Sequence, residues 1–220
     1  MDERISAEKY RLHWLMLIPL FLSNFWFQML QKLITSPVYH IYIPMDDYIP
    51  FVEAFVIPYV FWYVFVIVTG VFLFRKAPQD FTKFAGFLTI GMVVACTVYT
   101  FLPNGQELRP LLTKQGGPLS GILQFVYGLD PPRNNKAPSL HVIYACACHA
   151  GITFYNNRRN RVLWVNVVSF ILAALCTVST VFVKQHSIVD MWAGLLVSGA
   201  LYYLIYIRKW KVRGEAREKV

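Results

Sequence analysis

Six apolar runs, each long enough to cross a bilayer as a helix, constrain this chain more than any other feature of its sequence. A helix needs about 20 mostly apolar residues to cross about 30 Å of hydrocarbon. Such runs occupy residues 13–34, 51–74, 84–102, 138–155, 162–183 and 187–207. With 56% of its residues apolar and 15% charged, the chain also differs from soluble domains in composition. We therefore predict an all-α polytopic membrane protein, with residues 1–220 forming a single domain of six transmembrane helices.

The cations predict the orientation of these helices, because Lys and Arg in short loops are held on the cytoplasmic side. The chain has 21 Lys and Arg residues. Most of them lie before the first span, in the second-to-third and fourth-to-fifth connections, and after the last span. An even number of spans places these four segments on one side. We expect both termini in the cytoplasm, residues 1–12 as the amino terminus and 208–220 as a basic tail, and no nucleic-acid partner.

The remaining connections are expected on the external side. Residues 35–50 carry three prolines and two aspartates, which favours an extended acidic stretch over a helix. Residues 103–137 form the long external connection, and the apolar run 119–129 within it is too short to span, so it predicts a short interfacial helix. Small residues in the last three spans allow close packing, so we expect those spans to form the core and the first three to shield it.

Five ionisable residues converge on the external side of this topology: Arg109, His141, Lys184, His186 and Asp190. Polar groups beside membrane spans are costly, so a convergent set indicates a functional site. Two histidines, a carboxylate and two cations beside helix amino termini supply what phosphoryl transfer requires. The histidines lack short metal-ligand spacing, and the four cysteines lie in apolar runs as small core residues. We expect no metal and no other cofactor.

Each of these residues also has an ordinary structural interpretation. His186 and Asp190 are four apart, so the carboxylate could fix the imidazole tautomer, but Ser187 and Asp190 also form a helix-start signature. His141 follows a capping sequence, and Arg109 alone could reach to lipid headgroups. Three more cations of the long connection contact either a headgroup or solvent: Lys114, Arg133 and Lys136.

Three short motifs contain the clustered residues. They are Gln106-Glu107-Leu108-Arg109-Pro110, Pro138-Ser139-Leu140-His141, and Ser179-Thr180 followed by His186 and Asp190. In type and order they resemble the signature motifs of the type 2 phosphatidic acid phosphatase superfamily of integral membrane lipid phosphatases and phosphotransferases. The resemblance is strong from residue 103 onward and rests on architecture alone for the first three spans.

This resemblance implies a role for each matched position. His186 would attack phosphorus and carry a phosphohistidine, and Asp190 would orient it. His141 would protonate the departing lipid oxygen and then activate water or an alcohol. Arg109 would bind phosphate oxygens bidentately, helped by Ser139 and the backbone amide of Leu140. No metal is needed in such a site.

The sequence departs from the family pattern at two cations. The usual lysine seven residues before the arginine is Leu102 here, and the usual arginine after the serine is Thr180. Lys184 is the natural substitute as a phosphate-binding cation. Residues 181–186 and 46–51, with Leu140, are similar to the branch containing inositol phosphorylceramide synthases, which moves a phospho-headgroup between lipids.

Three functions are consistent with these features. The first is a metal-independent phosphatase of the plasma (inner) membrane, which hydrolyses a lipid phosphate or diphosphate monoester at the external face. The second is a phospholipid headgroup phosphotransferase with an alcohol acceptor. The third is a non-enzymatic membrane transporter or lipid-binding protein, which predicts ionisable residues through the bilayer midplane. His149 is the principal ionisable residue there, and we interpret it as a hydrogen-bonded helix-packing residue.

Overall fold

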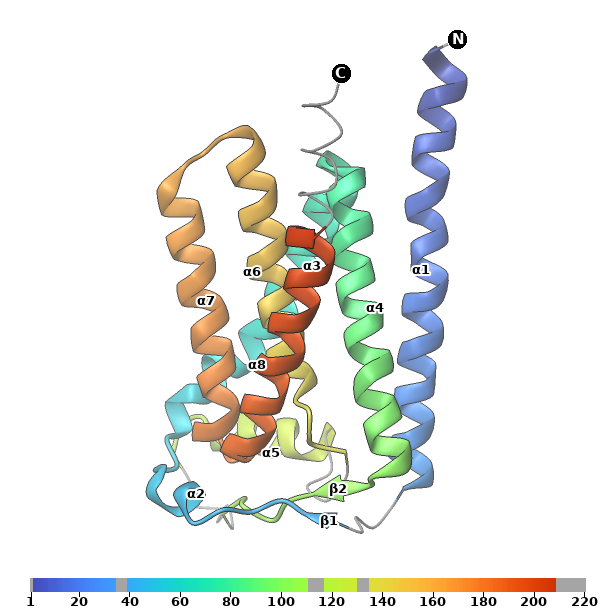
Figure 1. Ribbon diagram of the computed structural model, residues 1–220. Helices are drawn as coiled ribbons and strands as arrows, with labels where there is room; N and C mark the ends of the chain where they lie inside the picture. Colours follow the sequence, from blue (N-terminus) through green and yellow to red (C-terminus); the bar gives the residue numbers. More distant parts are fainter. Residues whose placement is uncertain (1, 35–38, 111–116, 130–134, 209–220) are drawn as a thin grey trace.

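The protein is almost entirely helical in the computed structural model, which describes residues 2–34, 39–110, 117–129 and 135–208. Six long helices run side by side (Figure 1). They are α1 (Asp2–Leu33), α3 (Val56–Lys76), α4 (Pro78–Phe101), α6 (Leu140–Arg159), α7 (Leu163–Phe182) and α8 (Ile188–Tyr202). Residues Tyr203–Ile207 continue α8 as a π-helical turn, η2. The all-α polytopic architecture agrees with the prediction.

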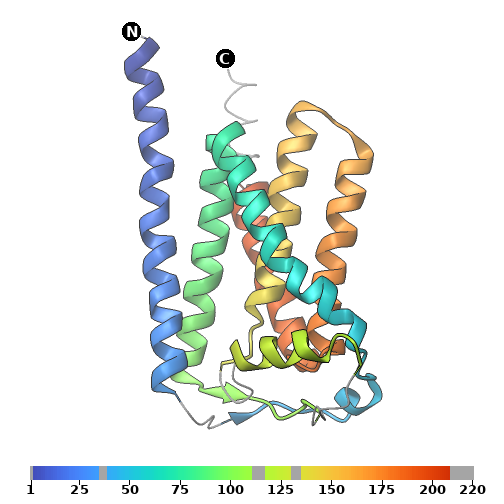
Figure 2. The same ribbon diagram turned by 180° about the vertical axis from the view of Figure 1, so that it is seen from behind.

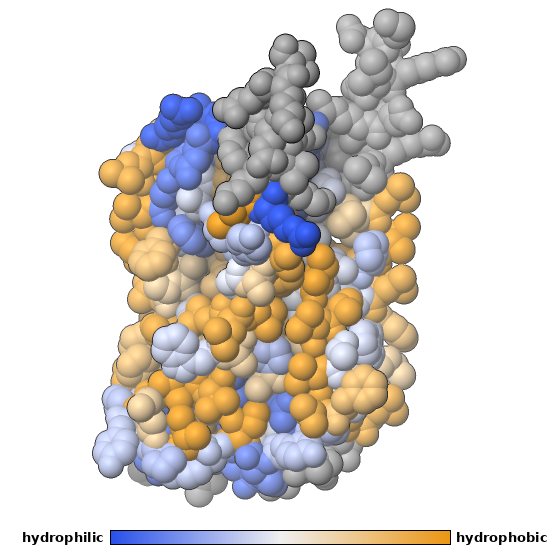
Figure 3. All heavy atoms as spheres, in the orientation of Figure 1, coloured by the Kyte–Doolittle hydropathy of each residue, from blue (hydrophilic) through white to orange (hydrophobic). Residues whose placement is uncertain are grey.

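Four helical segments of the described chain are long and apolar enough to cross a membrane. They are α3 with the preceding 3-10 turn η1 (Glu53–Phe55), α4, α7, and α8 with η2. The other two expected spans correspond to α1 and α6, which stand in the same bundle (Figure 1). Both are more polar at one end, because α1 begins 11 residues before the apolar run at residue 13 and α6 ends in Asn156-Asn157-Arg158-Arg159. On the face seen in Figure 3, apolar side chains predominate in the middle of the molecule, between more polar ends.

One end of the bundle holds the start of α1, the end of η2, and the α3–α4 and α6–α7 turns (Figure 1). The buried carboxylate of Asp80, in the first turn of α4, pairs there with Arg158 at 3.3 Å and Arg159 at 2.6 Å. Those arginines lie in the last turn of α6, where positive charge is favoured by the helix dipole. The segments that carry most of the cations therefore share one end, as an even number of helices requires.

Helix α6 lies at the centre and packs against α3, α4, α7 and α8. The expectation that the last three spans alone form the core is wrong, because α4 contributes many buried side chains to the same cluster and α8 only one, Leu201. The contact between α4 and α6 is tight: a Cβ at Gly91 would lie 2.6 Å from the Cγ2 atom of Ile143. Helix α4 is thus part of the core and not a shield.

The opposite end is covered by the long connections. The short helix α5 (Ser120–Leu129) lies across the ends of the long helices (Figure 2), which confirms the short helix expected there. Strands β1 (Tyr39–His40) and β2 (Asn104–Gly105) pair in parallel and join the first and second connections. The expectation of no helix in residues 35–50 is wrong for one turn, α2 (Met45–Tyr48). Asp46 stabilises this turn by accepting the N–H of Ile43 at 3.0 Å.

Candidate active site

The chain reverses sharply between α7 and α8 and presents His186. Lys184 takes a left-handed conformation with φ of 54°, which is uncommon for a residue with a side chain. The carbonyl of Thr180 accepts the N–H groups of Gln185 at 2.9 Å and His186 at 3.1 Å. These bonds satisfy a backbone carbonyl at the end of α7 and fix the backbone immediately before α8.

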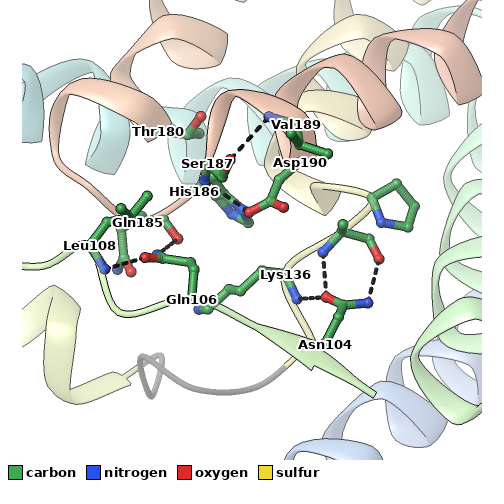
Figure 4. Close-up of polar contacts among 12 residues, drawn as sticks. Asn104, Gln106, Leu108, Lys136, Thr180, Gln185, His186, Ser187, Val189 and Asp190 are labelled. Carbon is green, nitrogen blue, oxygen red and sulfur yellow. Dashed lines mark hydrogen bonds and ion pairs between the residues drawn. The ribbon is translucent and has the colours of Figure 1, made fainter. Parts of the chain in front are cut away.

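His186 and Asp190 face each other at the start of α8 (Figure 4). The Nδ1 atom of His186 lies 3.2 Å from Oδ2 of Asp190, and both residues are buried. The same oxygen accepts the N–H of Ser187 at 3.0 Å, and the Ser187 hydroxyl accepts the N–H of Val189 at 3.2 Å. One carboxylate thus completes a capping box and also contacts the imidazole, so the helix-start interpretation is confirmed and the geometry allows Asp190 to orient the ring.

His141 lies in the first turn of α6, on the side of the bundle where α3 passes. Its ring stacks on Tyr59 at 4.5 Å and lies in a tilted contact with Trp62 at 4.1 Å, both measured between ring centroids. Trp62 also donates its Nε1–H to the carbonyl of His141 at 2.9 Å. The ring centroid of His141 is 6.2 Å from that of His186. The structure brings the two histidines together, and aromatic residues of α3 hold one of them in place.

Ser139 connects the two helices that carry the histidines. Its N–H donates to the carbonyl of Asp190 at 3.1 Å, so the start of α6 is joined directly to α8. Its hydroxyl is buried and has no hydrogen-bond partner within the described residues. Leu140 is half-buried and lines a cavity that also contacts His141 and His186. Both residues predicted by the second motif thus lie beside the histidine pair.

Arg109 reaches the same region from the long connection. Its guanidinium donates to the carbonyl of Tyr127 at 3.1 Å and to the side-chain oxygen of Gln185, the neighbour of His186. It also lies over the ring of Tyr127, 4.4 Å from its centroid. The Tyr127 hydroxyl donates to the carbonyl of Val183 at 2.6 Å. Burial raises the pKa of Tyr127 to about 12 against the opposing charge of Arg109, so this phenol stays a donor at neutral pH.

Lys184 and Asp46 form a connection that the sequence motifs do not reveal. The ammonium of Lys184 donates to the backbone carbonyl of Asp46 at 2.6 Å. The Asp46 carboxylate accepts from the Ser187 hydroxyl at 2.8 Å and from the N–H of Ile188 at 2.9 Å. The acidic stretch therefore caps the helix that carries Asp190. Its acidity is visible in the sequence, but its partner lies 141 residues away.

Two amides fix the long connection against the site (Figure 4). Gln106 donates to the carbonyls of Lys184 at 3.1 Å and Gln185 at 2.8 Å. Asn104 accepts the N–H groups of Lys136 at 2.9 Å and Ala137 at 2.8 Å. Both amides belong to the stretch around the first motif, yet only their hydrogen bonds show what they do.

Lys136 is 1% exposed and extends toward Gln106 (Figure 4). The solvated-surface interpretation is therefore wrong for Lys136, while Lys114 and Arg133 lie outside the described residues. His149 pairs through Nδ1 with the Ser169 hydroxyl at 2.9 Å, as expected of a helix-packing residue. In the described ranges no three His, Cys, Asp or Glu side chains are grouped closely enough to hold a metal ion.

Comparison with known proteins identifies a family but no individual relative. No curated protein and no solved structure matches the chain. The family model of the PAP2 superfamily matches residues 87–213, which contain Arg109 and both histidines of the site. Its members are generally phosphatases that act on lipid substrates in a membrane, so the match supports activity of the phosphatase or phosphotransferase type. Since the matched segment is more than half of the chain, the protein belongs to the PAP2 superfamily.

Proposed function

We propose that this protein is a metal-independent membrane phosphatase that hydrolyses a lipid phosphate or diphosphate monoester through a phosphohistidine on His186. The observation that supports this most directly is the buried contact of His186 with Asp190, only 6.2 Å between ring centroids from His141. Because Nδ1 of His186 faces the carboxylate, its Nε2 atom is left to act as nucleophile. One phosphoryl group can contact both imidazoles at this separation.

The reaction has two steps. In the first, Nε2 of His186 forms a bond to phosphorus, the bond from phosphorus to the lipid oxygen breaks, and His141 gives that oxygen a proton. In the second, His141 takes a proton from water, the water oxygen bonds to phosphorus, and the bond to His186 breaks. Arg109 neutralises the charge of the phosphate oxygens, and the buried Ser139 hydroxyl donates a hydrogen bond that positions them. Lys184 adds positive charge beside them while it holds Asp46.

The test uses the full-length protein in detergent with a radiolabelled lipid phosphate. His186→Ala is expected to abolish both phosphate release and the acid-labile phosphoenzyme. His141→Ala is expected to accumulate phosphoenzyme from a donor such as acetyl phosphate, whose leaving group needs no proton. The matched control is His40→Ala, an exposed histidine at the same end of the bundle. Hydrolysis by His186→Ala at the parent rate would show that the proposal is wrong, and a chelator is expected to leave the parent rate unchanged.

The proposal includes six spans, cytoplasmic termini and a site that faces outward from the plasma (inner) membrane. It is supported by the shared end of the cation-bearing segments (Figure 1). A cysteine at Tyr48, in the exposed turn α2, is expected to react with an impermeant maleimide in intact cells. A cysteine at Asn160, in the α6–α7 turn, is expected to react only after permeabilisation. The reverse pattern would invert the topology.

A headgroup phosphotransferase is the second candidate. It is favoured by the cavity of about 260 Å³ that His141 and His186 both line, because this cavity has room for an alcohol in place of water. Labelled phospholipid incubated with and without candidate acceptor alcohols separates the two candidates. Labelled free phosphate identifies hydrolysis, and a labelled new ester identifies transfer.

A further inference from the structure

The cavity beside the two histidines has a mostly apolar surface into which several uncharged polar side chains are set. It lies between α1, α3, α4 and the start of α6, and its polar walls include Asn24, Gln28 and Gln31 from α1 and Asn135 from the long connection. In the described part of the chain no Lys, Arg, Asp or Glu lines it. Arg109 and Lys184 are also absent from its walls. The cavity is therefore distinct in chemistry from the cationic side of the site.

Three carboxamides of α1 fall on one face of this helix. Asn24, Gln28 and Gln31 are spaced by four and three residues, so they lie above one another along the cavity. The rest of α1 from residue 14 to residue 30 is mostly apolar. Carboxamides in a membrane helix are costly unless they face a partner or a polar cavity. Their alignment gives the cavity a polar wall on the side of α1, where Gln31 is half-buried and Asn24 and Gln28 are exposed.

Several buried polar atoms of the cavity walls make no hydrogen bond within the described residues. Asn135 is 4% exposed, and neither its side-chain oxygen nor its nitrogen makes a hydrogen bond within the described residues. The same holds there for the side-chain oxygen of Gln31 and the hydroxyl of Tyr144. Unpaired buried groups of this kind are rare in native proteins and each requires a partner. Amides and a phenol together supply both donors and acceptors, which is what hydroxyl groups complement.

We propose that this cavity binds an uncharged, hydroxylated group: the alcohol whose oxygen leaves phosphorus in the first step or attacks it in the second. The inference rests on the proposed function. When the bond from phosphorus to His186 forms, the bond to the alcohol oxygen breaks and His141 protonates that oxygen. In the reverse direction the alcohol gives its proton to His141, its oxygen bonds to phosphorus and the bond to His186 breaks. Because His141 serves both steps, the leaving alcohol and the accepting alcohol occupy the same cavity.

The first experiment measures acceptors. The phosphoenzyme is formed from radiolabelled acetyl phosphate in the full-length protein, then divided among equal concentrations of glycerol, ethanolamine and serine. Glycerol is expected to be phosphorylated at least about tenfold more than either charged alcohol, because nothing in the cavity offsets an ammonium or carboxylate. Gln31→Leu is expected to lower this ratio about tenfold, since it leaves a hydroxyl without a partner. Asn135→Asp is expected to lower the ratio of glycerol to ethanolamine about tenfold, since its carboxylate offsets the ammonium. Met29→Leu, on an exposed position of α1, is the control expected to keep the ratio.

The second experiment measures donors and identifies the source of the alcohol. Rates of phosphoenzyme formation are compared in single turnovers for monoacylglycerol phosphate, a lipid that keeps one free hydroxyl, for glycerol 3-phosphate and for phosphoethanolamine. A preference for the lipid over glycerol 3-phosphate assigns the cavity to the hydroxylated part of the lipid itself, and equal rates for these two assign it to a free polyol. Glycerol 3-phosphate is expected to exceed phosphoethanolamine in both cases.

Equal use of glycerol and ethanolamine by the parent protein would overturn the inference while leaving the phosphohistidine mechanism intact. A preference that neither variant changes would overturn it as well. Failure to form a phosphoenzyme at all would instead overturn the proposed function. If Asn135→Asp does not fold, Gln31→Leu decides the question, because Gln31 is only half-buried on the outer helix α1.

Discussion

Replacing Gly194 with alanine should move the start of α6, which carries His141, away from α8, which carries Asp190. Gly194 lies one turn after Asp190 on α8, where that helix crosses the start of α6. A Cβ there would lie 2.9 Å from Cβ of Val142 and 3.0 Å from the backbone carbonyl of Ser139. Ordinary contact begins at 3.4 Å, so the helices must part by about 0.5 Å. Neither neighbour is the far end of a flexible side chain, so the movement falls on the backbone.

The size of the effect follows from this displacement. Moving catalytic groups by 1 Å costs on the order of 100-fold in rate, so a shift of about half that size should lower kcat about tenfold. Overpacking costs about 1–3 kcal/mol, and the better helix propensity of alanine returns at most about 1 kcal/mol. With the full gain, the free energy of unfolding should still fall by up to about 2 kcal/mol.

The assay compares initial rates on a lipid phosphate and thermal unfolding in one detergent. Gly199→Ala is the matched control on the same helix, because a Cβ there meets no atom within 4 Å. It should keep the parent rate and gain stability of up to about 1 kcal/mol from helix propensity. Equal rates and equal unfolding temperatures for the two variants would refute the argument that close approach of α6 and α8 sets the geometry of the site.

Three further changes test separate contacts. Asp46→Asn should lower the free energy of unfolding by about 1–2 kcal/mol and reduce kcat more than it raises KM, because the cap of α8 loses its charge. The control is Asp47→Asn at an exposed position, and equal effects of the two changes would contradict the role of Asp46 as the cap of α8. The parent protein should lose stability between pH 10 and pH 12, because a raised pKa favours the protonated phenol of Tyr127 in the folded state. Tyr127→Phe should reduce that loss, as thermal unfolding at pH 8 and pH 11 would show. Asp80→Asn, at the far end of the bundle, should cost about 1–2 kcal/mol of stability and leave the rate at the parent value.

Much of the fold is predictable because it is encoded locally. Length and hydrophobicity of each run are sufficient to place the long helices. The spacing of His186 and Asp190 puts both on one turn of a helix, and the short apolar run after Gly117 indicates α5. The second and third motifs lie at helix starts, so the side chains at those starts could be expected to gather at one end once the spans alternate in direction.

The contacts that were not predictable join residues far apart in the sequence. In the sequence, Gly91 cannot be distinguished from any other small residue of a membrane helix. Only its close approach to Ile143 in the structure shows that α4 belongs to the core. Lys136 lies in a polar loop, yet the fold buries it against Asn104 and Gln106 (Figure 4). The sequence shows the charge of Asp46 but not the groups that donate hydrogen bonds to it. Periodicity and motifs report on neighbours along the chain, whereas these residues depend on packing between elements.

The cap that Asp46 forms on α8 makes the start of that helix depend on a residue from the first quarter of the chain. The segment 87–213 that defines the family contains the donor groups, the Ser187 hydroxyl and the N–H of Ile188, but not the carboxylate that accepts from them. During synthesis Asp46 is made long before its partners, so the cap closes only after the final helical hairpin has inserted. A fragment that keeps every signature motif but begins after α3 would therefore start α8 without its cap, and supplying residues 1–77 as a separate chain should restore it.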